Sequence, residues 1–243
     1  KPADRTKDII AIKHRHSPCT MDRAVFTGCD TLWKCFKKTV WCHPQKPFLG
    51  VREEIQEGLA KTGSMAVRHG EYNWKTFEEV DEYVEALSRS IIHRKFCPYL
   101  KSGVEGTPDM KFLGIFSENR LEWIMTEIAC CSDSITVVPL AVENQFMNEE
   151  RIQNIINITE LSVICVSKAT IGVLLDMKSK DLIPKLKNII LFDTPEDAHI
   201  ALASQVGFNV FSFADLITEG YKIMDCRKDE PTSESILLLG VTS

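Results

Sequence analysis

The stretch from Phe112 to Leu140 constrains the fold more than any other part of this 243-residue sequence. It opens with a short apolar run that ends at Phe116 and is followed by a polar turn. Apolar side chains then recur at helical spacing from Leu121 to Ala129, and a second apolar, β-branched run closes the stretch. A strand, a helix and a strand within about thirty residues form a βαβ unit, whose parallel strands need helices on both faces. The stretch therefore predicts an α/β fold.

Further strands and helices alternate after this unit. The expected helices span 149–157, 170–177, 195–206 and 214–220, and the expected strands span 161–166, 188–192, 208–211 and, as a last buried strand, 236–239. Repeated alternation of strand and helix implies a doubly wound, mostly parallel sheet flanked by helices. An irregular basic N-terminal arm and a small hairpin and helix region are expected to precede this sheet.

The region before the sheet contains two helix signals and one hairpin signal. Residues 31–40 place apolar side chains near one helical face, and a second helix is expected from Thr76 to Arg94. Thr76 and Glu79 have the spacing of a capping box at the start of that helix. His69-Gly70-Glu71, between two short β-prone runs, predicts a hairpin turn. Residues 101–109 have the composition of a loop.

The charge is distributed unevenly along the chain. The net charge is −5, which argues against a nucleic-acid-binding protein as a whole. Residues 1–47 carry ten Lys and Arg against four Asp, a net of +6, which leaves −11 for the remainder. Such an arm can contact an anionic surface such as a membrane face. The alternative interpretation is a solvated, partly ordered leader, which the sequence favours.

Cysteine usage and hydropathy indicate the compartment. None of the nine cysteines lies in a C-x-x-C pair, and two of them, Cys130 and Cys131, are adjacent within a predicted helix. This scatter is typical of reduced cytosolic thiols used as small apolar packing residues. No apolar run approaches the roughly 18 residues of a membrane span. Because the chain begins with Lys1, we expect it to be a piece of a longer protein, in which an anchoring segment could precede it.

The common nucleotide and hydrolase motifs do not occur in this sequence. It contains no G-x-G-x-x-G after a strand, no complete G-x-x-x-x-G-K-[ST], no G-x-S-x-G and no H-E-x-x-H. An oxidoreductase with a dinucleotide-binding domain is therefore disfavoured, and no catalytic or metal-ligating residue is assigned.

Two places remain as candidates for chemistry. Glu118, Asn119, Arg120 and Glu122 follow the Phe112 strand, at the sheet edge where ligands usually bind. The alternative, which we favour, is that Asn119 caps the next helix while Arg120 and Glu122 make surface contacts. The other candidate is the end of the sequence, where an apolar run passes into 240–243 (GVTS), as phosphate loops begin.

At this point the sequence resembles the N-terminal portion of long-chain acyl-CoA synthetases, in the adenylate-forming superfamily, over roughly residues 20–243. The stretch 112–140 is similar to that family nearly throughout. The other matching stretches, in the family's order, are TLW at 31–33, FLGVR at 48–52, YNWKTF at 72–77, IINITELSVICVSK at 155–168, LKNIILFD at 186–193, GFNVFSFADL at 207–216 and ILLLGVTS at 236–243.

The resemblance implies a role for Thr242 and Ser243. With Val241 they fall on the aromatic-Thr-Ser start of the family's phosphate loop, TSGTTG followed by PKG, which binds the phosphates of ATP. Val241 stands where the family has an aromatic residue, and residues 141–144 (AVEN) depart from the family's Tyr-Asp-Thr-Leu-Gly. The family's other catalytic motifs follow this point and are not expected within this chain.

The resemblance also implies a function for the parent protein, an ATP-dependent ligase of lipid metabolism. It would adenylate a fatty acid with ATP and Mg²⁺, then transfer the acyl group to coenzyme A. Residues 1–47 would form the basic arm and first helix, and 48–243 the first α/β subdomain of the large domain, truncated at the phosphate loop. The segment alone would be inactive. The alternative is a truncated, non-catalytic relative that acts as a binding or dimerisation module.

The implied location is cytoplasmic, with peripheral contact to the endoplasmic reticulum or another cytosolic membrane face. A homodimer is also compatible with the resemblance, and no nucleic-acid partner is expected.

Overall fold

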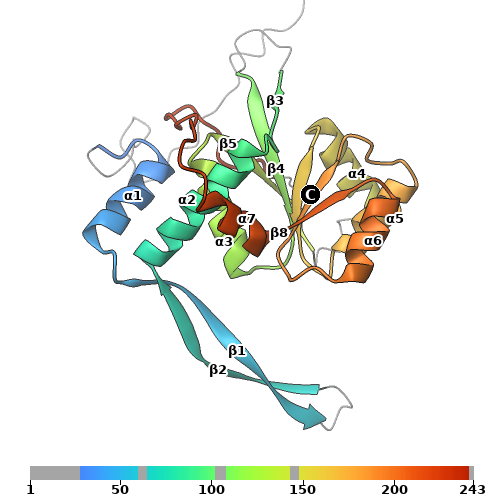
Figure 1. Ribbon diagram of the computed structural model, residues 1–243, viewed down its shortest axis with the longest axis horizontal. Helices are drawn as coiled ribbons and strands as arrows, with labels where there is room; N and C mark the ends of the chain where they lie inside the picture. Colours follow the sequence, from blue (N-terminus) through green and yellow to red (C-terminus); the bar gives the residue numbers. More distant parts are fainter. Residues whose placement is uncertain (1–27, 60–64, 102–107, 143–147, 241–243) are drawn as a thin grey trace, which may run out of the picture.

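A parallel sheet with helices on both faces forms the body of the protein (Figure 1). The computed structural model describes residues 28–59, 65–101, 108–142 and 148–240. The strands of this sheet are β3 (Tyr99–Leu100), β4 (Met110–Phe116), β5 (Ile135–Pro139), β6 (Val163–Val166), β7 (Asn188–Leu191) and β8 (Asn209–Ser212). The parallel strands lie in the order β5-β4-β6-β7-β8, and β3 pairs antiparallel with the start of β4.

The helices form two layers around this sheet. They are α1 (Leu32–Cys42), α2 (Phe77–His93), α3 (Leu121–Cys131), α4 (Glu149–Ile158), α5 (Ile171–Ser179), α6 (Asp197–Gln205) and α7 (Phe213–Gly220). Helices α2, α3 and α7 cover one face with α1 outside α2, and α4, α5 and α6 cover the other (Figure 1). The predicted α/β fold with flanking helices is confirmed.

Strand β4 shows why both faces need helices. Its side chains alternate between the two apolar cores, with Leu113 and Ile115 in the core under α2 and α3. Phe112 and Phe116 belong to the core under α4 and α5. A strand that is buried on both faces has a continuous run of apolar residues, and this run predicted β4 from the sequence. The predicted βαβ unit is confirmed, since β4 and β5 pair in parallel from Lys111 onward.

The predicted capping box at the start of α2 is also present. The backbone N–H of Glu79 donates to the Thr76 hydroxyl at 3.2 Å, and the Thr76 N–H donates to the Glu79 carboxylate at 2.7 Å. Each contact satisfies an amide that the first helical turn leaves unpaired. Helix α1 has a simpler N-cap, in which the N–H of Lys34 donates to the Thr31 hydroxyl at 3.2 Å.

The hairpin predicted at His69-Gly70-Glu71 is wrong. Strand β2 (Met65–Thr76) runs through these residues and pairs antiparallel with β1 (Pro47–Leu59). Arg52 pairs with Tyr72 and Glu54 with His69, so β2 has one extra residue at this point. The signal around Gly70 therefore marks a β-bulge. Strands β1 and β2 form a two-stranded ribbon that projects from the body (Figure 1).

The last predicted strand, 236–239, is also not buried. Leu238 makes only an isolated parallel bridge to Val137 on the outer edge of β5. Ile236, Leu238 and Leu239 remain 47%, 40% and 37% exposed, since no described element packs over them. This segment ends a stretch without regular secondary structure after α7, residues 221–240, which we call the strap.

The predicted loop at 101–109 falls largely on residues 102–107, which lie outside the described part of the chain.

Candidate functional site

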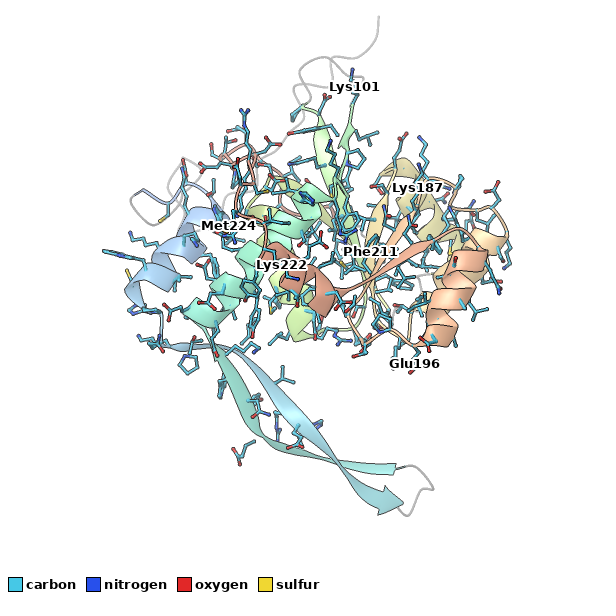
Figure 2. The ribbon with its side chains drawn as sticks, in the orientation of Figure 1. Lys101, Lys187, Glu196, Phe211, Lys222 and Met224 are labelled. Carbon is cyan, nitrogen blue, oxygen red and sulfur yellow. The ribbon has the colours of Figure 1, made fainter. Side chains whose placement is uncertain are left out.

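Polar side chains gather at the carboxyl edge of the sheet, where β4, β6 and β7 end. In Figure 2, Glu196 lies at this edge and Lys187, just before β7, lies at the opposite one. The ribbon projects on the same side as Glu196 (Figure 1). We call the joined residues the carboxyl-edge network: Glu118, Arg120, Glu122, Ser167, Lys168 and Asp193.

Arg120 is the centre of the carboxyl-edge network. Its Nε donates to Glu122 at 2.7 Å and its Nη1 donates to Asp193 at 3.0 Å, while Glu118 lies 3.8 Å away. Partial burial lowers the pKa of Arg120, but the hydrogen bonds to Glu122 and Asp193 outweigh burial and raise it above its ordinary value. The guanidinium therefore stays charged and joins the loop after β4 to the loop after β7.

The loop after β6 is held by the same acids. Glu118 accepts a hydrogen bond from the Ser167 hydroxyl at 2.8 Å, and Asp193 accepts one from the backbone N–H of Lys168 at 2.7 Å. Burial raises the pKa of Asp193, but the Lys168 N–H and the Arg120 guanidinium outweigh it and lower the pKa overall. Three strand ends are thus fixed to one another at this edge.

This arrangement does not fit a triphosphate. The charge of Arg120 is already balanced by carboxylates, so it offers no excess positive charge to an anion. Within the described ranges no group of three or more His, Cys, Asp or Glu side chains could hold a metal ion. The network is a support for the sheet edge, as the sequence favoured for Arg120 and Glu122.

The expected capping role of Asn119 is wrong. Helix α3 starts one residue later, with Arg120 at the N-cap position in an extended conformation and no side-chain cap. Asn119 is exposed, and it lines a groove of about 870 Å³ between the ribbon and the start of α3. Tyr72 and Trp74 stack on the ribbon wall of this groove, with ring centroids 5.2 Å apart.

Sequence reasoning missed Ser167, Lys168 and Asp193 as members of the network. A usable signal was present, because each of these polar residues follows a predicted parallel strand as Glu118 does. The carboxyl ends of parallel strands meet at one edge, so these residues had to lie along that edge, and the strand order decides which of them are neighbours. Thr242 and Ser243, the predicted start of a phosphate loop, lie outside the described residues, as do Glu143 and Asn144.

The network leads to a stability prediction for Arg120. Arg120→Met is expected to cost about 1–3 kcal/mol at neutral pH, because half-buried acids lose their charged partner. Urea unfolding measures the cost, and Arg151→Met on the exposed surface of α4 is the matched control. Because the pKa of Asp193 is lowered, its stabilisation is present above the ordinary carboxyl pKa and is lost as the pH falls through the lowered value. Equal unfolding midpoints for wild type and Arg120→Met would refute this role.

Similarity to known proteins agrees with this fold. No family model matches the chain. Long-chain-fatty-acid–CoA ligase 5 of Rattus norvegicus is 28% identical over 191 residues, which cover 78% of this chain and 24% of that protein. Long-chain-fatty-acid–CoA ligase 6 of Homo sapiens is 30% identical over 169 residues, covering 69% of this chain and 20% of that protein. The chain is a homologue of long-chain fatty-acid–CoA ligases.

The similarity covers only part of the length of these ligases. The chain spans about a quarter of the curated relatives it matches. Among solved structures, the A-PCP didomain of the carboxylic acid reductase from Segniliparus rugosus, in complex with AMP, matches 91% of this chain and 31% of its own. The TM-score is 0.68 at 16% sequence identity, so the fold is that of an adenylation domain. The resemblance to long-chain acyl-CoA synthetases stated from the sequence is confirmed by the curated relatives.

Proposed function

We propose that this chain is the N-terminal part of an ATP-dependent long-chain fatty acid–CoA ligase. The parent enzyme activates a fatty acid with ATP and Mg²⁺ to an acyl-adenylate and then forms the thioester with coenzyme A. The observation that carries the proposal is the alignment with fatty-acid–CoA ligases over 78% of the chain. The adenylation-domain fold supports it independently of sequence identity.

Within this proposal the chain supplies scaffold and little chemistry. Residues 48–243 form the first α/β subdomain, and residues 1–47 form the basic arm and first helix. Thr242 and Ser243 begin the phosphate loop, and the groups that bind adenine, Mg²⁺ and the acyl chain come from elsewhere in the enzyme. The pairing of Arg120 with Glu122 and Asp193, which joins the loops after β4 and β7, supports the scaffold role.

Residues 1–243 alone are therefore expected to be inactive. They should form no measurable acyl-CoA and should bind ATP weakly or not at all, because a phosphate loop needs its glycine amides to surround the anion. Isothermal calorimetry with Mg·ATP and a thioester assay with palmitate test this. Micromolar ATP affinity would contradict it, and the longer protein is the positive control.

The alternative function is a truncated, non-catalytic relative that acts as a binding or dimerisation module. Half-exposed apolar side chains on the strap and the ribbon support this alternative, because exposed apolar surfaces often bind a partner protein. The transcript beyond codon 243 separates the two functions. A continuation of the GTTG-x-PKG type favours the ligase, and a stop codon favours the module. Light scattering would then measure the mass of the module and so its oligomeric state.

Contact with a cytosolic membrane face remains part of the proposal for the parent enzyme. Trp41 on α1 is 83% exposed, and a tryptophan in that state suits a lipid headgroup region. Lys37 adds little to such contact, because Asp81 of α2 holds it at 2.6 Å. None of the described helices has the length and hydropathy to cross a bilayer. Co-sedimentation with phosphatidylserine vesicles, for the chain with and without residues 1–47, tests whether the arm binds the membrane. Equal binding by both forms would exclude that role.

A further inference from the structure

The ribbon of β1 and β2 carries a fixed stack of aromatic side chains. Trp74 pairs across the ribbon with Gly50, and a Cβ at Gly50 would lie 2.8 Å from the indole, so the glycine lets the ring lie on the backbone of β1. Tyr72 stacks on Trp74, and the guanidinium of Arg52 lies 5.5 Å from the centre of the Tyr72 ring. Arg52 is itself held by two hydrogen bonds of 2.9 Å to backbone carbonyls of β2. Both rings are therefore fixed before any partner binds.

Both rings are half exposed and line the groove between the ribbon and the start of α3. Tyr72 is 51% exposed and Trp74 is 53% exposed. A two-stranded ribbon without a third strand or a helix over its face is only marginally stable in water. Large aromatic side chains at the wall of a groove are typical anchors of protein interfaces. The described part of the chain thus leaves half of each anchor uncovered.

The wall of the groove opposite the ribbon favours an uncharged partner. Leu121 and Ile124 of α3 line this wall, and Asn119 adds an exposed amide. The charges at this wall belong to the carboxyl-edge network, in which Arg120 pairs with Glu122 at 2.7 Å. Apolar side chains and an amide can contact an apolar polypeptide surface and bond to its backbone. A phosphate or a nucleic acid would find no excess positive charge at this wall.

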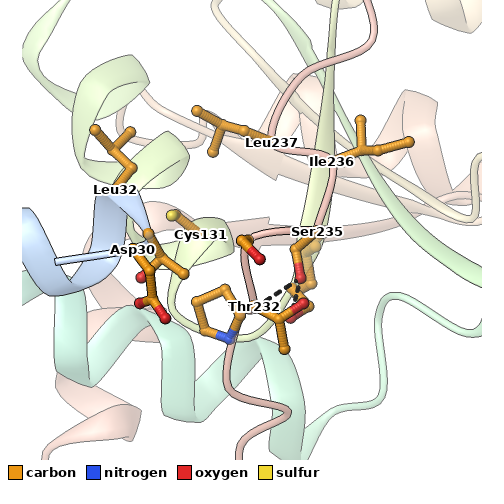
Figure 3. Close-up of a pocket in the computed structure, with 12 residues that line it drawn as sticks. Asp30, Leu32, Cys131, Thr232, Ser235, Ile236 and Leu237 are labelled. Atoms are coloured by element: carbon orange, nitrogen blue, oxygen red, sulfur yellow. Dashed lines mark hydrogen bonds between the residues drawn. The ribbon is translucent and has the colours of Figure 1, made fainter. Parts of the chain in front are cut away.

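The pocket under the strap is not a comparable site. It has a volume of about 150 Å³ and lies between the strap and the start of α1 (Figure 3). Its strap wall is a turn that bonds to itself, since the N–H of Thr232 donates to the Ser235 hydroxyl at 3.0 Å. Cavities that hold a ligand are usually roughly 300–1,000 Å³ in volume. The groove at the ribbon, with about 870 Å³, is the larger of the two and has room for several side chains.

The strap brings the chain toward the side of the molecule on which the groove lies. Val137 of β5 donates to the Leu237 carbonyl and accepts from the Leu239 N–H, both at 2.9 Å, so the strap runs parallel to β5. It therefore points to the carboxyl edge of the sheet, where α3 begins and the ribbon projects (Figure 1). In the curated relatives the matched part is about a quarter of the length. A polypeptide that continues from the strap would leave the body at this edge.

We propose that the groove between the ribbon and α3 is the docking site for an uncharged, apolar face of the polypeptide that follows residue 243 in the parent enzyme. Tyr72 and Trp74 are the anchors of this contact, and the covered ribbon ties the first α/β subdomain to the rest of the enzyme. The identity of the occupant rests on the proposed function, in which the chain continues, whereas the exposure of the two anchors does not.

Hydrogen–deuterium exchange, compared between residues 1–243 and the longer enzyme at equal concentration, tests the docking. Peptides covering 69–76 of the ribbon are expected to exchange about tenfold more slowly in the longer enzyme, because docking protects a marginally stable ribbon. Helix α5, which lies on the other face of the sheet from α3, is the internal reference. Equal exchange of the ribbon in the two proteins would overturn the proposal.

Two variants of the longer enzyme place the contact in this groove. Trp74→Ser should return the ribbon to the exchange rate of residues 1–243, and Trp41→Ser, at the exposed tryptophan of α1, is the matched control and should leave the rate slow. Loss of the indole could also loosen the ribbon itself. Asn119→Glu therefore brings a charge against the apolar occupant from the opposite wall, keeps the ribbon sequence intact and should also speed exchange. Slow ribbon exchange in both Trp74→Ser and Asn119→Glu would show that the occupant lies elsewhere.

Light scattering of residues 1–243 tests the other occupant, a second copy of this chain. A monomer is expected. A dimer that Trp74→Ser dissociates would assign the groove to a second copy and overturn the proposal. Acyl-adenylate formation by the longer enzyme is measured separately. If the longer enzyme forms none, the proposed ligase function fails, while the exchange difference still decides whether the following polypeptide covers the groove.

Discussion

Replacing Gly220 with alanine is expected to destabilise the protein by about 3 kcal/mol or more, because no space exists for a methyl group. A Cβ at this position would lie 1.8 Å from the carbonyl oxygen of Ala86, a backbone atom that cannot rotate away. Gly220 ends α7 where it packs on α2, and the Ser90 hydroxyl of α2 donates to the Leu216 carbonyl of α7 at 2.5 Å. Opening this contact would expose one side of the core under α2.

Thermal unfolding measures the effect, which should lower Tm by roughly 10 °C for a chain of this size. Gly172→Ala is the matched control, since nothing lies within 4 Å of the new Cβ and the residue is in helix α5. That substitution should be neutral or slightly stabilising, because alanine favours helix over glycine. Equal Tm values for the two variants would show that α2 and α7 are not packed as described.

Lys111→Met is expected to cost about 3–5 kcal/mol, because it leaves the buried carboxylate of Asp133 without its partner. Burial disfavours the charged amine and acts to lower its pKa, but Asp133 and Asp229 outweigh burial and raise the pKa of Lys111. The Lys111 ammonium therefore stays charged at neutral pH, where it pairs with the Asp133 carboxylate at 2.6 Å.

Chemical denaturation of three variants distinguishes the loss of the buried Lys111–Asp133 ion pair from the loss of a lysine charge. Lys111→Met should lose most stability, and adding Asp133→Leu should recover part of it, because two apolar residues can replace a buried ion pair. Lys222→Met, at an exposed lysine of the strap labelled in Figure 2, should change little. A double variant no more stable than Lys111→Met alone would contradict this account.

The parts of the fold that the sequence predicted correctly are those with local signals. Thr76 and Glu79 define the start of α2 within four residues, and β4 is readable because both of its faces are apolar. The order of strands and helices followed from the same periodicities. These elements require no knowledge of what packs against them.

The errors arose where distant residues decide the structure. Gly70 looked like a turn because its pairing with β1 is set by a register that begins at Pro47. The 236–239 run looked buried because its apolar composition does not reveal which neighbours cover it. Likewise, Lys168 and Asp193 entered the carboxyl-edge network only when three strand ends were placed side by side.

The strand order has a consequence for synthesis on the ribosome. After β4 and β5, each new strand pairs with one already made, β6 on β4, β7 on β6 and β8 on β7. A nascent chain can therefore extend its sheet as it emerges, without waiting for a distant partner. Other contacts form only when the end of the described chain is made, and one of them joins Asp229 to Lys111 and Asp133. The amino edge of the sheet is thus expected to close last, after translation has passed residue 229.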